Sequence, residues 1–213
     1  MKKLITLVSL MLCSGCHSYG KENPQSLWWS IAFKGPPYML GEVELRVVED
    51  INGKHFPRSG GGAVGTDAPE DGTESARGWP RILGGSIEPV TGAALPKRIF
   101  VRWQSVVEAQ TYRAWVDIPE EGREVMRVST DQRCPKTQRY RYHASLIMGL
   151  APGGIVQVWA SDSCYDAIKI ARAQAEIEPL GPSQGKNDGR YAYKIGEKTQ
   201  RYIEHYGIPY GSW

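Results

Sequence analysis

Residues 97–118, KRIFVRWQSVVEAQTYRAWVDI, contain the pattern that decides the fold. Its first nine residues are rich in β-branched and aromatic side chains, which favour a strand. In its second half, apolar side chains share one side of the chain at every second position, and these are Tyr112, Ala114, Val116 and Ile118, with Trp115 on the other side. A period of two is typical of a half-buried strand. We therefore expect two strands, at 97–105 and 110–119.

The pattern continues towards the C-terminus. Residues 139–150 and 154–161 flank the turn sequence Ala151-Pro152-Gly153-Gly154, which suits a hairpin. Residues 124–130, EVMRVST, predict a further short strand. Residues 165–179 combine an Ala-rich composition, which favours a helix, with an alternation that favours a strand, and we predict a strand.

The C-terminal region changes period. Apolar and aromatic residues of 191–206 recur at helical spacing, at Ile195, Thr199, Tyr202, Ile203 and Tyr206. Gly207 is placed to end a helix there, and Pro209 prevents its continuation. We expect the tail GIPYGSW to pack its two aromatic residues back on the body.

The N-terminal part of the body is less regular. Residues 27–34 and 42–49 have aromatic or β-branched runs around the turn-rich 35–41, which suggests an early strand pair. Residues 52–96 are dense in Gly, Pro and short polar residues, and predict a long surface loop with little regular structure. Gly60–Gly65 fits Gly-x-Gly-x-x-Gly, but Pro69 opposes the helix that a nucleotide site needs, so we expect a flexible glycine loop and no nucleotide.

These patterns predict one mainly β domain over residues 27–213. We expect an antiparallel sheet or a sandwich, with the C-terminal α-helix packed on its side or end. Of the tryptophans, we assign Trp28, Trp29, Trp103, Trp115 and Trp159 to structural burial in strands. Trp79, within the glycine-rich loop, is the candidate for contact with a partner, although anchoring its loop to the body is an equal alternative.

Residues 1–15 read as a signal peptide. Lys2 and Lys3 precede a short apolar run, and Ser14-Gly15 is the small pair expected at a cleavage site. The sequence resembles a bacterial lipobox, in which Cys16 is lipidated and 16–26 form a tether. The alternatives are an ordinary signal peptide and a haem or redox pair read from Cys-x-x-Cys-His.

The residue after Cys16 bears on localisation. His17 stands where an Asp would retain an enterobacterial lipoprotein in the inner membrane, so we expect a lipid-anchored protein on the periplasmic side of the outer membrane. Processing removes two lysines, and the formal charge therefore falls from +3 to +1. With no long basic cluster left, we expect no nucleic-acid partner.

The remaining chemistry-bearing residues are few. Cys134 and Cys164 predict one disulfide in an oxidising periplasm, the alternative being two free thiols. His143 and Ser145 would share one side of a strand, but no third group orients them. Glu120-Glu121 predicts a solvated corner or the first turn of a short helix. We therefore expect no enzyme activity, no metal and no cofactor.

Four segments carry a resemblance to a known family. They are LPKRIFVRWQSVVEAQTYRAWVDIP, YHASLIMGLAPGGIVQVW, EIEPLGPSQG and YIEHYGIPYGSW. They resemble the bacterial lipoproteins of domain of unknown function family 2931. Members often accompany type VI secretion loci, and some resemble periplasmic immunity proteins for phospholipase effectors. The family supplies no catalytic residues to transfer.

The resemblance implies a function that the residues alone do not. We expect an envelope-anchored immunity protein that binds a periplasmic phospholipase effector and blocks its active-site cleft. The alternative is a non-enzymatic structural or assembly lipoprotein of the outer membrane. A third hypothesis, an enzyme acting on envelope lipid or glycan, requires a pocket with convergent polar groups.

Overall fold

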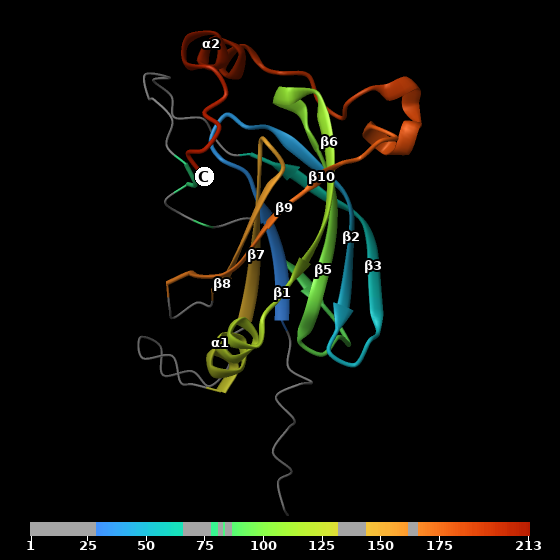
Figure 1. Cartoon of the computed structure of the whole chain (residues 1–213), viewed down its shortest axis with the longest axis vertical. Coiled ribbons are helices and arrows are strands. Elements are labelled where there is room, and N and C mark those ends of the chain that lie inside the picture. Colours follow the sequence, from blue (N-terminus) through green and yellow to red (C-terminus); the bar gives the residue numbers. More distant parts are fainter. Residues whose placement is uncertain (1–28, 66–77, 81–82, 84–86, 132–143, 162–165) are drawn as a thin grey trace, which may run out of the picture.

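The computed structural model of the protein (Figure 1) describes every residue except 1–28, 66–77, 81–82, 84–86, 132–143 and 162–165. In chain order its strands and α-helices are β1 (Trp29–Lys34), β2 (Gly41–Asp50), β3 (His55–Val64), β4 (Glu88–Val90), β5 (Pro96–Ser105), β6 (Gln110–Asp117), α1 (Glu120–Asp131), β7 (Ala144–Ala151), β8 (Ile155–Ser161), β9 (Ile168–Gln174), β10 (Glu176–Ile177) and α2 (Glu197–Tyr206). Short 3-10 helices are η2 (Val106–Glu108), η3 (Pro182–Gly185) and η4 (Asn187–Gly189).

The described strands form two five-stranded sheets that pack face to face (Figure 1). The first sheet has the order β4-β1-β7-β8-β9 and the second has the order β10-β6-β5-β2-β3. Neighbouring strands are antiparallel, except that β1 and β7 are parallel. This confirms the prediction of a mainly β fold with a C-terminal helix.

The core lies between the two sheets and draws on both. Its fully buried members include Ile31, Leu146, Met148 and Val158 of the first sheet and Val43, Val48, Ile99, Val101 and Val116 of the second. Each alternates with residues on the outer side of its strand, as the period of two requires. The alternation at 112–118 therefore gives the inner side of β6 correctly.

The predicted early strand pair is wrong. Strands β1 and β2 both form, but β1 joins the first sheet and β2 joins the second. Between them the chain passes from one sheet to the other, through two prolines and Tyr38, whose φ is +66°. A turn-rich sequence between two strands shows that the chain changes direction, but it does not show whether the strands share a sheet.

The long loop predicted over 52–96 is also partly wrong, because β3 and β4 form within it. Gly60 and Gly62 have φ of +73° and +78°, and lie opposite the register shift between Val43 and Leu45. A Cβ on Gly61 would come within 2.7 Å of Val43 Cγ1. The glycines therefore make a bulge in an edge strand, paired to β2, and are not a flexible loop.

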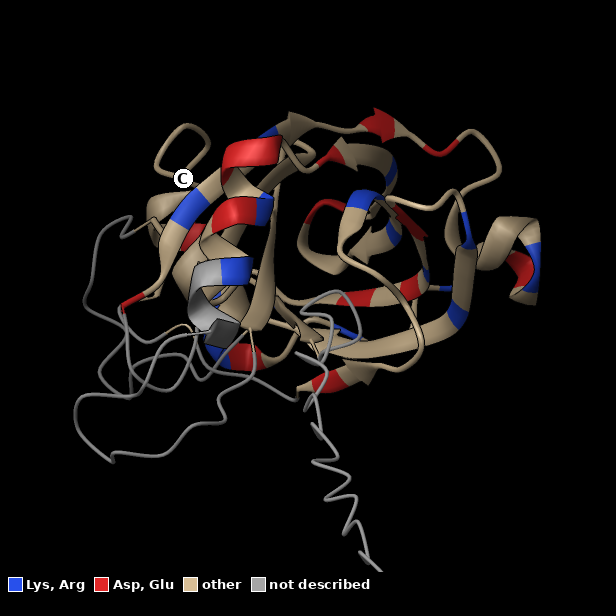
Figure 2. Ribbon diagram, turned by 90° about the horizontal axis from the view of Figure 1, so that it is seen from below, with Lys and Arg blue, Asp and Glu red and all other residues tan. Residues whose placement is uncertain are grey.

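The strand predicted at 124–130 is wrong as well, because these residues belong to α1. Arg123 and Arg127 pair with Glu120, at 2.6 Å each, as the alternative of a first helical turn at Glu120 allows. Gly122 and Met126, four residues apart, share the side of α1 that meets the sandwich, where Met126 is fully buried. Acidic and basic residues are interspersed along α1 (Figure 2).

The C-terminal half follows the prediction more closely. The hairpin β7–β8 forms with both turn glycines at positive φ. Within the ambiguous 165–179 segment, β9 and β10 form at 168–174 and 176–177, which confirms a strand there. Helix α2 begins at Glu197, later than the predicted 191, and ends as expected where the Gly207 N–H donates to the Ile203 carbonyl at 2.8 Å. Neither described α-helix is long and apolar enough to span a bilayer.

Candidate partner-binding face

Several predicted site residues lie outside the described residues. These are Cys16, Cys134, Cys164 and His143. The lipid anchor and the disulfide therefore stay predictions. Ser145, which was considered as a partner of His143, shares a hydrogen bond of 2.8 Å with the Ser30 hydroxyl.

Trp79 packs on the outer side of the first sheet. Its ring meets Trp159 edge to face at a centroid distance of 5.1 Å, and it covers Gly149, where a Cβ would come within 2.6 Å of Trp79 Cζ3. Ala32, Ile147 and Trp159 are buried beneath Trp79 and Leu83. Trp79 thus anchors its segment to the body, and its role as a partner contact stays a prediction.

The C-terminal tail covers the same sheet at the hairpin end. Trp213 is buried and donates from Nε1 to the Pro152 carbonyl at 3.0 Å. The Tyr210 and Tyr112 hydroxyls both donate to Glu108 Oε1, at 2.9 and 3.2 Å. Burial and the Glu108 charge raise the pKa of Tyr210 to about 12. The Trp213 prediction is confirmed, whereas the Tyr210 ring is 60% exposed and is fastened mainly through its hydroxyl.

The outer side of the second sheet differs, because none of the described segments packs over its middle. The registers of its strands place four apolar residues in one row across β3, β2, β5 and β6, namely Pro57, Val47, Phe100 and Trp115. We call this the apolar row. The Phe100 and Trp115 rings are in contact at a centroid distance of 5.4 Å, and Trp115 is 41% exposed.

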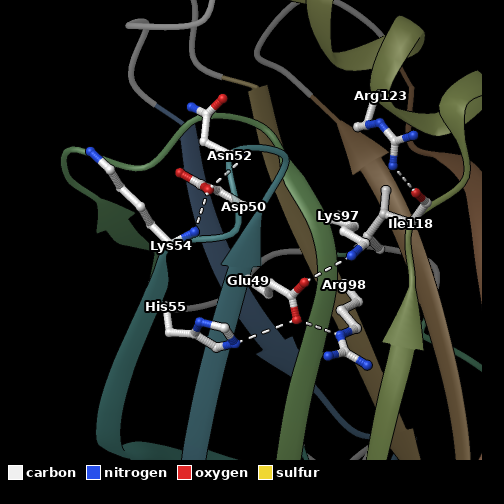
Figure 3. A network of polar contacts seen from close by, with 9 residues as sticks. All are labelled: Glu49, Asp50, Asn52, Lys54, His55, Lys97, Arg98, Ile118 and Arg123. Atoms are coloured by element: carbon white, nitrogen blue, oxygen red, sulfur yellow. Dashed lines mark hydrogen bonds and ion pairs between the residues drawn. The ribbon is translucent and has the colours of Figure 1, made fainter.

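A charged row lies on one side of the apolar row. It crosses the same strands and consists of His55, Glu49, Arg98 and Asp117. Figure 3 shows His55, Glu49 and Arg98 side by side. Glu49 accepts from Lys97 Nζ at 3.0 Å and from Arg98 Nε at 2.6 Å, and His55 Nε2 lies 3.4 Å from it. The hydrogen bonds from Lys97 and Arg98 lower the pKa of Glu49 to about 2, so it is ionised at neutral pH.

Arg98 connects the charged row to the apolar row. Its guanidinium carbon lies 4.3 Å from the centre of the Trp115 ring, while its Nε donates to Glu49. Its two Nη atoms point away from Glu49 (Figure 3). A guanidinium held by a carboxylate on one edge and by an indole face has lost much of its rotamer freedom before any partner arrives.

A second charged row lies on the other side of the apolar row. It is formed by Leu45, Arg102, Arg113 and Glu176, in register across β2, β5, β6 and β10. Arg102 Nε donates to Glu44 at 2.7 Å, and Arg113 lies 3.6 Å from buried Glu178. Glu44 and Glu178 are buried, whereas Arg113 is 39% exposed and Glu176 is 78% exposed.

A ledge formed by residues 182–193 ends the face at the second charged row. Its backbone is fixed to the sheet, since the Ser183 N–H donates to Glu44 Oε1 at 2.5 Å and the Ala192 N–H donates to Gln104 Oε1 at 2.7 Å. Four non-glycine residues of the ledge have left-handed backbone conformations, at Ser183, Gln184, Asn187 and Asp188. Such conformations persist where surrounding contacts impose them. We call the three rows and the ledge the open face.

The open face provides aromatic and apolar area between charged groups, which suits contact with another macromolecule. A shallow depression lies elsewhere, lined by Pro36, Pro37, Tyr38, Gly78, Tyr202, Pro209 and Trp213. The described residues that line it have no carboxylate, imidazole, serine or cysteine side chain. Within the described ranges, no three His, Cys, Asp or Glu residues gather where they could hold a metal ion.

The assignment of Trp115 to structural burial is wrong, because this residue is 41% exposed. Trp29, Trp103 and Trp159 are buried as predicted, while Trp28 lies outside the described residues. The alternation in the sequence already places Trp115 on the side of β6 that faces away from the core. Its alignment with Phe100 and Val47 could not be predicted, because it depends on how three strands pair.

Comparison with known proteins identifies the family. The family model described as "Protein of unknown function (DUF2931)" matches residues 17–211, which is most of the chain. No curated protein and no solved structure matches this chain. The chain therefore belongs to this family.

Proposed function

We propose that this member of the DUF2931 family is an envelope-anchored lipoprotein that binds and neutralises a periplasmic phospholipase effector of type VI secretion. The open face is the observation that carries the proposal, since it places the exposed Trp115 and the half-buried Phe100 between charged rows. Three further features support it: the lipobox ending at Cys16, the absence of a recognisable catalytic motif in the sequence, and the resemblance of the four segments to lipoproteins found beside such effectors.

The composition of the face supports a protein partner. Trp and Arg are the residues most enriched at the centres of protein interfaces, and here Trp115 and Arg98 lie in contact. A sheet held by a packed core and bordered by a fixed ledge changes little on binding, so little conformational entropy is lost there. The open face can thus bind a partner without a conformational change.

Neutralisation would follow from blocking access. A lipase acts at a bilayer surface, so a protein bound over its active-site cleft prevents substrate from entering. A lipid anchor at Cys16 would hold the immunity protein within reach of the same bilayer and raise its effective concentration there.

Co-expression tests the proposal. The product of a neighbouring lipase-like gene is directed to the periplasm, alone or with the full chain. We expect the full chain to protect the cells and a Trp115→Asp variant to fail, while Ile168→Asp, at an exposed position of the first sheet, protects as well as wild type. Continued killing with wild type and no detectable complex would contradict the proposal and favour the structural or assembly lipoprotein.

The covalent features have separate tests. Incorporation of radiolabelled palmitate should be lost in Cys16→Ala, and equal labelling of the variant would rule out the lipid anchor at this residue.

A disulfide between Cys134 and Cys164 should change the electrophoretic mobility of the protein on reduction. Two titratable thiols in the unreduced protein would show that the bridge is absent.

A further inference from the structure

We infer that Arg98 and Trp115 are the main partner-binding residues of the open face. Together they bind a carboxylate side chain of the partner and an apolar side chain next to it. The inference rests on the proposed function, because it names the chemistry that the same face recognises. The occupant is a segment of a protein in which Asp or Glu adjoins an aliphatic or aromatic residue.

The carboxylate follows from what Arg98 has left to donate. Its Nε donates to Glu49, and its guanidinium carbon lies over the Trp115 ring, 4.3 Å from the ring centre. Its two Nη atoms point away from Glu49 (Figure 3). Paired N–H groups on a planar guanidinium match the two oxygens of a carboxylate, and charge-assisted bonds of this kind are short and directional.

The apolar neighbour follows from the row beside Arg98. Phe100 and Trp115 contact each other, and Val47 and Pro57 continue the row across β2 and β3. Four adjacent strands at about 4.8 Å spacing give a row about 14 Å long. That length accommodates two or three side chains of one partner segment. An apolar side chain on Phe100 and Trp115 would also exclude water from the ion pair at Arg98 and strengthen it.

The charge pattern favours a protein over an anionic bilayer. Asp117 lies opposite Arg98 in the register, and Glu176, which is 78% exposed, lies opposite Arg113. A flat anionic surface would meet these acids at the same time as the arginines. A single carboxylate reaching Arg98 need not approach Glu176, which lies on the far side of the apolar row.

Two neighbouring cations allow a matched experiment. Lys97 and Arg98 both donate to Glu49, and Lys97 is the more exposed, at 58% against 38%. Affinity of the full chain in detergent for the purified lipase-like protein is measured for Arg98→Lys, Lys97→Gln and Trp115→Ala. We expect Arg98→Lys and Trp115→Ala each to weaken binding about thirtyfold, as hot-spot residues do, and Lys97→Gln to change it less than about threefold.

Arg98→Lys keeps the charge and removes the planar fork, so a charge effect alone would leave its binding near wild type. Thermal unfolding of each variant shows whether the fold is retained. If wild type binds and Arg98→Lys binds equally well, or if Lys97→Gln loses as much affinity, the inference is overturned while the proposed function stands.

A second arm covers the case in which wild type does not bind that protein, which would contradict the proposed function. A displayed library of random peptides is selected on the full chain, with Arg98→Lys as the counter-selection. Peptides with an acidic residue beside an aromatic or aliphatic one that bind wild type but not the Arg98→Lys variant would support the inferred role of Arg98 and Trp115. Recovery of no such peptides, or binding of anionic phosphatidylglycerol vesicles that depends on Arg98, would overturn it.

Discussion

The outer sides of the two sheets carry similar residues and meet different surroundings. The first sheet has Trp159 on its outer side, buried beneath Trp79. The second has Trp115, which remains 41% exposed with Arg98 against its ring. One tryptophan completes the fold and the other is left for contact, so the number of tryptophans says less about function than what covers each of them.

The largest effect should come from the covered side. Trp159→Ala removes a buried indole and leaves a cavity beneath Trp79, so we expect the free energy of unfolding to fall by about 3–5 kcal/mol. Urea denaturation followed by circular dichroism measures it. Trp159→Phe, which keeps most of the buried volume, serves as the control, and a loss below about 1 kcal/mol for the Ala variant would show that Trp79 does not seal this face.

A smaller loss is expected at the glycine between these two rings. A Cβ on Gly149 would lie 2.6 Å from Trp79 Cζ3 and 2.7 Å from Trp159 Cζ3. Gly149→Ala should therefore destabilise the protein by about 1–3 kcal/mol, through overpacking. In a Trp79→Ala background the same substitution should be better tolerated. Equal losses in both backgrounds would mean that Trp79 is not pressed against Gly149.

On the open face, the pH dependence of stability should trace to Glu49. Its pKa in the folded protein is about 2, below the ordinary 4.5, so its contribution to stability is complete above pH 4.5 and is lost as the pH falls towards 2. The urea midpoints of wild type and Glu49→Gln should differ at pH 7 and converge near pH 2. A difference that stays constant over this range would contradict the ion pairs at Glu49.

The smallest effect on stability should come from Trp115. Its ring is half in solvent, and an exposed cation–π contact with Arg98 contributes about 0.5–1 kcal/mol. We therefore expect Trp115→Ala to change the free energy of unfolding by no more than about 1 kcal/mol, although it weakens partner binding. A loss as large as that of Trp159→Ala would remove the distinction between the two faces.

Periodicity predicted what is local in this fold. The inner side of β6, the β7–β8 hairpin and the end of α2 at Gly207 each depend on residues within a few positions of one another. The sheet to which β1 belongs does not, because its partners lie at Glu88–Val90 and Ala144–Gly149. The glycines of β3 form a strand only because β2 supplies the hydrogen bonds.

The candidate face was beyond the sequence for the same reason. Alternation shows that Trp115 and Phe100 lie outside the core, but not that Val47 and Pro57 extend them into one row. The two charged rows likewise combine residues from different strands, such as Glu49 with Arg98. Seven residues of α1 were assigned to a strand because a short run with apolar residues at 125, 126 and 128 fits either period, and the ion pairs of Glu120 became visible only in three dimensions.

The parallel pairing of β1 with β7 sets an order of events during biogenesis. Ser30 and Ser145, which share a hydrogen bond across this pair, are 115 residues apart in the chain. Strand β1 emerges early from the ribosome or the export channel, and β4 can pair with only its first three residues. Its other edge therefore stays unpaired until β7 emerges much later. Long-range pairing of this kind folds slowly and exposes aggregation-prone segments to chaperones. In the proposed lipoprotein, the strand nearest the lipid would thus be held at the membrane before the fold secures it.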